Sequence, residues 1–173
     1  QHGCREVDQG VAILTQSSNI AINITMQNRG LPIGYVIACG NQAQTSQADV
    51  AIHLLNDPRI TSIGLHIEGF GDLRKWESLA HKAHQKKIPI IVLKSGKSLQ
   101  AQSAAISHTA TVAGSDAGAQ AFLDRLGVRR ADSLPVFLGM LKLSHQFGTI
   151  KSKKIASISC SGGEAALAAD AAY

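Results

Sequence analysis

The chain has 173 residues, of which 45% are hydrophobic and 17% are charged, and its formal net charge is +5. This composition excludes a disordered chain, and an aromatic content of 4% argues against a nucleic-acid partner despite the basic charge. No apolar run approaches the roughly 20 residues that a membrane span requires. We therefore expect a cytoplasmic protein that binds neither nucleic acid nor a membrane.

The cysteines Cys4, Cys39 and Cys160 are widely spaced and odd in number, which indicates free thiols in a reducing compartment. Their spacing matches no metal-ligand pattern, so we expect no metal site, and we expect Cys160 to be buried. The chain begins with Gln1 and ends inside an alanine-rich helical pattern. It is therefore interpreted as a piece of a longer polypeptide.

Short apolar runs alternate with segments of helical periodicity along the chain. The apolar runs predict buried strands at Val11–Thr15, Ile33–Cys39, Ser62–Ile67, Ile88–Leu93 and Ile155–Ser159. The helical spacing predicts helices at Asn19–Asn28, Gln47–Leu55, Leu73–Lys86, Ala117–Leu126 and Leu134–Phe147. Strands that alternate with helices pair in parallel, and continuously apolar strands are covered on both faces. The pattern predicts an α/β fold of the flavodoxin-like three-layer α/β/α sandwich type with a mainly parallel sheet.

A change in composition near residue 147 predicts a domain boundary. Residues 1–147 form the first domain, and residues 148–173 are expected to be a linker followed by the first strand, turn and helix of a second flavodoxin-like unit. Ligands of parallel sheets collect beyond the carboxyl ends of the strands. Polar residues expected at that edge are Gln16-Ser17-Ser18, Gly40-Asn41, Glu68, Lys94 and Ser161-Gly162-Gly163.

His108 lies among small residues, from Ser107 to Asp116, that leave its imidazole open to a ligand. A histidine that takes up a phosphoryl group needs a free ring nitrogen, a partner for the other nitrogen, and compensation of the phosphate charge. Glu68 follows an apolar strand, and its carboxylate is placed to orient the imidazole. The residues alone leave a plainer interpretation open, with His108 an inert loop histidine and Glu68 an acid that caps a turn.

Two predicted helix starts supply candidate phosphate cradles, Gln16-Ser17-Ser18 and Ser161-Gly162-Gly163. Free amides at a helix N-terminus attract anions, and glycines permit close backbone approach. Ordinary helix capping explains the same residues equally well. Lys94 and Lys97 are placed either to contact phosphate or simply to be solvated, whereas Ser115 or Asp116 is expected to cap a helix without taking part in chemistry.

The order of these segments resembles a known family. Gly10 to Ser18, Asp57-Pro58, Glu68, Lys94 to Ser98, Ser107-His108-Thr109 with Gly114-Ser115-Asp116, and Ser161-Gly162-Gly163 together are similar to the ADP-forming acyl-CoA synthetases, related to the succinyl-CoA synthetase alpha subunit. The resemblance covers nearly the whole chain, and the Ser-His-Thr to Gly-Ser-Asp stretch is its most specific part.

The resemblance implies a ligase that forms acyl-CoA from a carboxylic acid, CoA and ATP, with release of ADP and phosphate, through an acyl phosphate and a phosphohistidine. His108 matches the phosphorylated histidine and Glu68 the acid that holds it. Gln16, Ser17 and Ser18, with Ser161, Gly162 and Gly163, match two phosphate-binding helix starts. This sequence departs from the family pattern at Ser18, Ala110 and Glu164. At Glu164, a carboxylate that faced inward would repel phosphate.

The resemblance also implies partners that this sequence does not contain. CoA and ATP or ADP with Mg²⁺ would bind mainly to an upstream CoA-binding domain and to an ATP-grasp domain or subunit, in a homo- or hetero-oligomer. The fragment alone is then incomplete as an acid–CoA ligase, and its residues bind phosphate. Two alternatives stay open: a non-catalytic regulatory or interaction module of a larger CoA-related protein, and a flavin-binding flavodoxin. A hydroxyl-rich phosphate loop and flanking aromatic residues, which a flavodoxin needs, are lacking.

Overall fold

The computed structural model describes residues 6–98, 100–101, 115–150, 152 and 154–172. Its strands are β1 (Gly10–Thr15), β2 (Ile33–Ala38), β3 (Ile60–Ile67), β4 (Ile90–Lys94) and β5 (Arg129–Ala131). Its helices are α1 (Ser18–Met26), α2 (Gln47–Leu54), α3 (Leu73–Lys86), α5 (Asp116–Leu126), α6 (Leu134–Phe147) and α7 (Gly162–Ala172).

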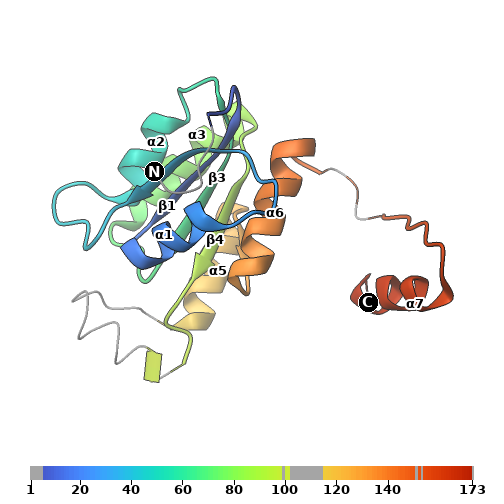
Figure 1. Cartoon of the computed structure of the whole chain (residues 1–173). Helices are drawn as coiled ribbons and strands as arrows, with labels where there is room; N and C mark the ends of the chain where they lie inside the picture. The colour runs from blue at the N-terminus through green and yellow to red at the C-terminus, as the bar shows by residue number, and fades with distance from the viewer. Residues whose placement is uncertain (1–5, 99, 102–114, 151, 153, 173) are drawn as a thin grey trace.

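The five strands form one sheet in the order β2-β1-β3-β4-β5, and every neighbouring pair is parallel. Helices cover both faces of this sheet (Figure 1). The strand order is that of the flavodoxin-like doubly wound sheet. The flavodoxin-like α/β/α sandwich predicted from the alternation of apolar runs and helical segments is therefore confirmed.

The two faces of the sheet carry separate apolar cores. One core joins β1, β3 and β4 to α2, α3 and α5, with Trp76, Leu79 and Leu123 as large buried side chains. The other core joins the opposite face to α1 and α6 through Ile24, Phe137 and other buried residues. Because side chains alternate along a strand, residues 63, 65 and 67 of β3 face α2 and α3, and residues 62, 64 and 66 face α1 and α6.

Helix α6 packs closely on the middle of the sheet because β3 has a glycine there. A Cβ atom added at Gly64 would lie 2.6 Å from Phe137 Cζ and 2.7 Å from Leu141 Cδ1. Both side chains belong to α6 and are fully buried. Any side chain at position 64 would push the helix away from the sheet.

The helices begin where short polar residues satisfy the free amides of the first turn. These N-caps are Ser17, Ser46, Asp72, Ser115 and Ser133. The capping role expected for Ser115 or Asp116 belongs to Ser115, whose Oγ accepts a hydrogen bond of 3.0 Å from Gly118 N.

Three sequence predictions were wrong. Residues 155–159 do not form a strand, and Ile155 and Ile158 are exposed, because a strand needs a partner for its backbone groups and the described residues supply none here. Cys160 is exposed rather than buried, since it lies beside this unpaired segment. The fifth strand is instead β5, which is too short and polar to show an apolar run.

After α6 the chain runs away from the sandwich to α7, which stands apart from the sheet (Figure 1). No residue of α7 is buried within the described part of the chain. Among the described residues, no helix combines the length and the apolar composition needed to cross a lipid bilayer.

Candidate functional site

The sheet reverses its winding direction between β1 and β3. From β1 the chain passes through α1 to β2 on one side, and β3 then pairs with β1 on the other side. At such a switch point the connections diverge to opposite faces and leave a crevice at the carboxyl ends of the strands, where ligands bind in folds of this class. Gln16 and Ser17 follow β1 and Glu68 follows β3, so these sequence-predicted residues lie together at the crevice.

Gln16 and Glu68 are in direct contact. The backbone N–H of Glu68 donates a hydrogen bond to Gln16 Oε1. Gln16 is 6% exposed, and its Nε2 and Glu68 Oε2 are buried without a hydrogen-bond partner in the described part of the chain. Buried polar atoms are nearly always paired. The switch point therefore holds one unused donor and one unused acceptor on neighbouring residues.

Helix α1 opens at the same place. Ser17 caps the helix by accepting a hydrogen bond of 3.4 Å from Ile20 N. Ser18 and Asn19 in the first turn are exposed, and that turn carries no acidic residue. The amides of a first turn have no acceptor inside the helix, and the helix dipole adds partial positive charge. The start of α1 is thus electrostatically suited to an anion.

A buried imidazole underlies this helix start. His66 Nδ1 lies 2.9 Å from Thr15 Oγ1, and both side chains are buried on the face covered by α1 and α6. Burial lowers the pKa of His66, and the nearby Glu68 carboxylate opposes this shift. The carbonyl of His66 accepts a hydrogen bond of 3.0 Å from Gln47 Nε2. The backbone N–H of Gln47 also donates a hydrogen bond of 2.6 Å to Gln42 Oε1.

Charged side chains gather where β4 and β5 end. Lys94 is 1% exposed, and its Nζ donates to the carbonyl of Ser95 at 3.1 Å. Burial lowers the pKa of this lysine, and the neighbouring Asp116 carboxylate opposes that shift. Of the two roles considered for Lys94, free solvation is therefore wrong, because its side chain is almost fully buried.

Two ion pairs join the segments around β4 and α5 to β5. Arg130 Nη2 lies 2.5 Å from Asp116 Oδ1, with the arginine side chain 6% exposed, and Lys97 Nζ lies 3.0 Å from Asp132 Oδ1. Asp116 is the first residue of α5, and its pKa is lowered mainly by the hydrogen bond from Arg130. The start of α5 is consequently fixed to the edge of the sheet.

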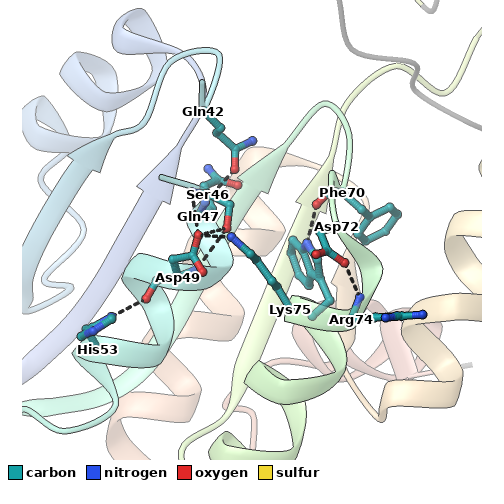
Figure 2. Close-up of polar contacts among 10 residues, drawn as sticks. Gln42, Ser46, Gln47, Asp49, His53, Phe70, Asp72, Arg74 and Lys75 are labelled. Carbon is teal, nitrogen blue, oxygen red and sulfur yellow. Dashed lines mark hydrogen bonds and ion pairs between the residues drawn. The ribbon is translucent and has the colours of Figure 1, made fainter. Parts of the chain in front are cut away.

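A further polar cluster ties α2 to α3 (Figure 2). Ser46 and Asp49 form a capping box at the start of α2, and Lys75 Nζ of α3 lies 2.6 Å from Asp49 Oδ2. The hydrogen bonds from Lys75 and then Ser46 lower the pKa of Asp49 to about 2. At the start of α3, the N-cap Asp72 accepts from Arg74 N at 2.9 Å, and Trp76 Nε1 donates to the carbonyl of Phe70 at 2.7 Å. This cluster holds the helix starts beside the crevice.

Two of the remaining predicted segments are not brought to the crevice by the described structure. His108 and Ala110 lie outside the described residues. Ser161-Gly162-Gly163 opens α7, which stands apart from the sheet, so the described structure does not bring this segment to the crevice (Figure 1).

At the start of α7 the side chains are already paired with each other. Ser161 Oγ accepts a hydrogen bond of 3.2 Å from Glu164 N, and Cys160 Sγ donates to Glu164 Oε2 at 3.3 Å. These contacts, with that of Cys160 foremost, lower the pKa of Glu164. The Glu164 carboxylate is therefore held near the start of the helix that the sequence offered as a second cradle.

Sequence analysis missed several residues of the site. Thr15, His66, Gln47 and Arg130 all lie at the carboxyl edge of the sheet and are buried or nearly so. The available signal was a polar residue near the end of an otherwise apolar strand, as in Thr15 after Leu14 and His66 after Leu65. Gln47 gave no such signal, because it begins a helix.

The fold and the crevice define a flavodoxin-like α/β domain with polar side chains gathered at its switch point. Residues 8–144 match the family model of the succinyl-CoA ligase like flavodoxin domain. The chain belongs to this family, and the known proteins to which it is similar are ADP-forming acyl-CoA synthetases.

Two curated relatives illustrate the similarity. The chain is 34% identical over 163 residues to an ADP-forming acetate–CoA ligase of Methanocaldococcus jannaschii, covering 93% of this chain and 23% of that protein. It is 33% identical over 162 residues to the alpha subunit of the ADP-forming acetate–CoA ligase II of Pyrococcus furiosus, covering 92% of this chain and 35% of that subunit. The chain thus spans 23% and 35% of the length of these two relatives.

Solved structures show the same fold. The acetyl-coenzyme A synthetase 1 of Ca. Korarchaeum cryptofilum, in complex with phosphate and ADP, superposes with a TM-score of 0.79 at 22% identity. That match covers 96% of this chain and 36% of the synthetase chain.

Proposed function

We propose that this chain is the phosphohistidine domain of an ADP-forming acyl-CoA synthetase. His108 carries the phosphoryl group between an acyl phosphate and ADP, and Glu68 orients its ring. Gln16, Ser17 and Ser18 bind phosphate at the start of α1, and Ser161, Gly162 and Gly163 provide the second cradle. Residues 1–147 form the phosphohistidine domain, and residues 148–173 are the linker and the start of the next ligase domain.

One observation carries this proposal: the buried Oε2 of Glu68 has no hydrogen-bond partner within the described residues. A buried carboxylate oxygen requires a donor, and an imidazole N–H is a suitable one. Gln16 Nε2, also buried and unpaired there, is a donor suited to a phosphate oxygen. Gln16 lies two residues before the first residue of α1 and is hydrogen-bonded to Glu68, and the amides of that helix start favour an anion.

The chemistry follows from these positions. The free nitrogen of His108 attacks the γ-phosphorus of ATP, the bond from that phosphorus to the bridging oxygen breaks, and ADP leaves with the electron pair. The carboxylate of the acid then attacks the phosphorus of the phosphohistidine, the phosphorus–nitrogen bond breaks, and an acyl phosphate forms. The other ring nitrogen keeps its proton and donates it in a hydrogen bond to Glu68. The carboxylate thereby stabilises the positive charge that develops on the ring.

The proposed substrates of the full enzyme are a carboxylic acid, CoA, and ATP or ADP with Mg²⁺. Relatives named as ADP-forming acetate–CoA ligases, and a fold neighbour solved with phosphate and ADP, support this proposal. Within the described ranges, no group of three or more His, Cys, Asp and Glu side chains is arranged to hold a metal ion. Mg²⁺ is accordingly proposed to arrive with the nucleotide, on an ATP-grasp domain or subunit, and CoA on an upstream domain of the same oligomer.

The test is phosphorylation of the full-length protein by radiolabelled ATP and Mg²⁺. The expected product is a base-stable, acid-labile phosphate that disappears in His108→Asn. His53→Asn is the matched control, since His53 is an exposed histidine on α2. Retention of the label in His108→Asn would reject the carrier role. Unchanged activity of the whole protein in that variant would favour a non-catalytic regulatory or interaction module instead.

A further inference from the structure

The imidazole of His66 is a polar group in the core that the proposed phosphoryl transfer does not use. It is 3% exposed and lies near the carboxyl end of β3, paired in register with Thr15 of β1. Its ring faces α1 and α6, as do Ser62 and Gly64 of the same strand. A histidine kept inside an apolar core at this cost in desolvation is expected to hold a specific hydrogen bond.

The hydroxyl of Thr15 makes three polar contacts. Ser17 N donates to Thr15 Oγ1 at 3.0 Å, Thr15 Oγ1 lies 3.2 Å from the carbonyl oxygen of Ser17, and His66 Nδ1 is 2.9 Å away. A hydroxyl has one proton and two lone pairs. All three contacts are satisfied together only when the hydroxyl donates to Ser17 and the imidazole donates from Nδ1.

This arrangement reaches the helix start directly. Thr15 Oγ1 is hydrogen-bonded to both the N–H and the carbonyl of Ser17. Ser17 is the N-cap, and its Oγ accepts a hydrogen bond from Ile20 N. The same residue precedes the exposed first turn of α1, where Ser18 and Asn19 present their amides. Without an N–H at the position of Nδ1, Thr15 is free to turn its hydroxyl away from Ser17.

We propose that His66 is a positioning residue that, through Thr15, fixes the turn of the phosphate-binding start of α1. The inference rests on the proposed phosphate site at that helix. His66 does not touch the phosphate. It sets the geometry of the α1 backbone amides that contact the phosphate. The tautomer that carries the proton on Nδ1 is the form that can donate to Thr15.

The chain supplies a matched control for the same bond. Thr61 Oγ1 lies 2.8 Å from His145 Nδ1, between the start of β3 and α6. This is also a threonine–imidazole hydrogen bond anchored on β3, but it lies at the opposite end of the strand from the crevice. Changing His145, which is half-buried, removes a hydrogen bond of the same kind, whereas a loss of phosphate affinity is expected only from changing His66.

The experiment measures the dissociation constant of inorganic phosphate for the full-length protein by titration calorimetry, together with its unfolding in urea. We expect His66→Phe to weaken phosphate binding about 3- to 10-fold, the usual effect of one lost hydrogen bond, and His145→Phe to leave it unchanged. His66→Asn places an amide N–H near the position of Nδ1 and is expected to restore the affinity. His66→Gln places its amide near Nε2 and is not.

Each outcome bears on the inference. Equal phosphate affinities in His66→Phe and His145→Phe would overturn the inference. If His66→Phe does not fold, equal phosphate affinities in His66→Asn and His66→Gln would overturn it. A wild-type protein that binds no phosphate would overturn it together with the α1 cradle. Failure of wild-type phosphorylation at His108, with phosphate binding still dependent on His66, would reject the carrier proposal and leave this inference standing.

Discussion

The backbone N–H of Glu68 donates a hydrogen bond to the side-chain oxygen of Gln16, so β1 and β3 are joined by a polar contact just beyond their paired residues. The two residues expected from sequence to contact phosphate and histidine therefore also hold each other in place. Structural and functional effects of changing them can be separated, because the backbone N–H of position 68 remains whatever side chain it carries.

Replacing Gln16 with leucine removes the acceptor and leaves the Glu68 N–H without its partner. We expect the free energy of unfolding in urea to fall by about 1–3 kcal/mol. Glu68→Gln keeps that N–H and its acceptor, so its unfolding free energy should stay within about 0.5 kcal/mol of wild type while phosphorylation is lost. Equal destabilisation of both variants would show that the Gln16 contact is not the stabilising element.

The ion pair between Arg130 and Asp116 predicts a local effect on α5. Arg130→Met leaves the first residue of the helix without its partner, so amide hydrogen exchange at residues 116–119 should accelerate and stability should fall by about 1–2 kcal/mol. The control is Arg125→Met, which breaks the more exposed pair with Glu77. That change should cost less than about 1 kcal/mol, and a similar loss in both variants would contradict the prediction.

Asp49 predicts a dependence of stability on pH. Its pKa in the folded protein is lowered to about 2, mainly by Lys75, so the unfolded chain takes up protons first as the pH falls. The stabilisation from this carboxylate is therefore complete above its ordinary pKa of about 3.9 and is lost as the pH falls towards 2. Unfolding free energies of wild type and Lys75→Met should converge over that range. A constant difference between them would contradict the prediction.

Gly64 predicts that the sheet has no room for a methyl group beneath α6. Gly64→Ala should lower the free energy of unfolding by about 1–3 kcal/mol, because the new Cβ meets Phe137 and Leu141. The control is Gly139→Ala in α6, where an added Cβ meets nothing within 4 Å. That change should raise stability by about 0.5–1 kcal/mol. Thermal unfolding of both variants would show whether their effects have opposite signs.

The sequence predicted the central strands because Val11–Thr15 and Ser62–Ile67 are apolar runs covered on both faces. The sequence predicted the wrong residues for the fifth strand. Residues 155–159 were read as a short apolar run but have no partner strand among the described residues, and β5 has only three residues, two of them arginines. Pairing depends on contacts with distant residues, which local periodicity does not contain.

The candidate site was predictable where a residue followed a strand, as with Gln16, Ser17 and Glu68. It was not predictable where the role depends on which side chain lies opposite. Thr15 and His66 are 51 positions apart and meet only because β1 and β3 pair in register. Nothing in either sequence neighbourhood identifies the other as its partner.

The placement of β1 beside β3 has a consequence for synthesis on the ribosome. A nascent chain that has emerged only as far as β2 already contains the start of α1, but the carboxylate and imidazole that complete the crevice have not yet been translated. Early intermediates should therefore have no affinity for phosphate. Ligand binding would then report completion of the sheet, and anions in the cell would favour the finished domain over its precursors.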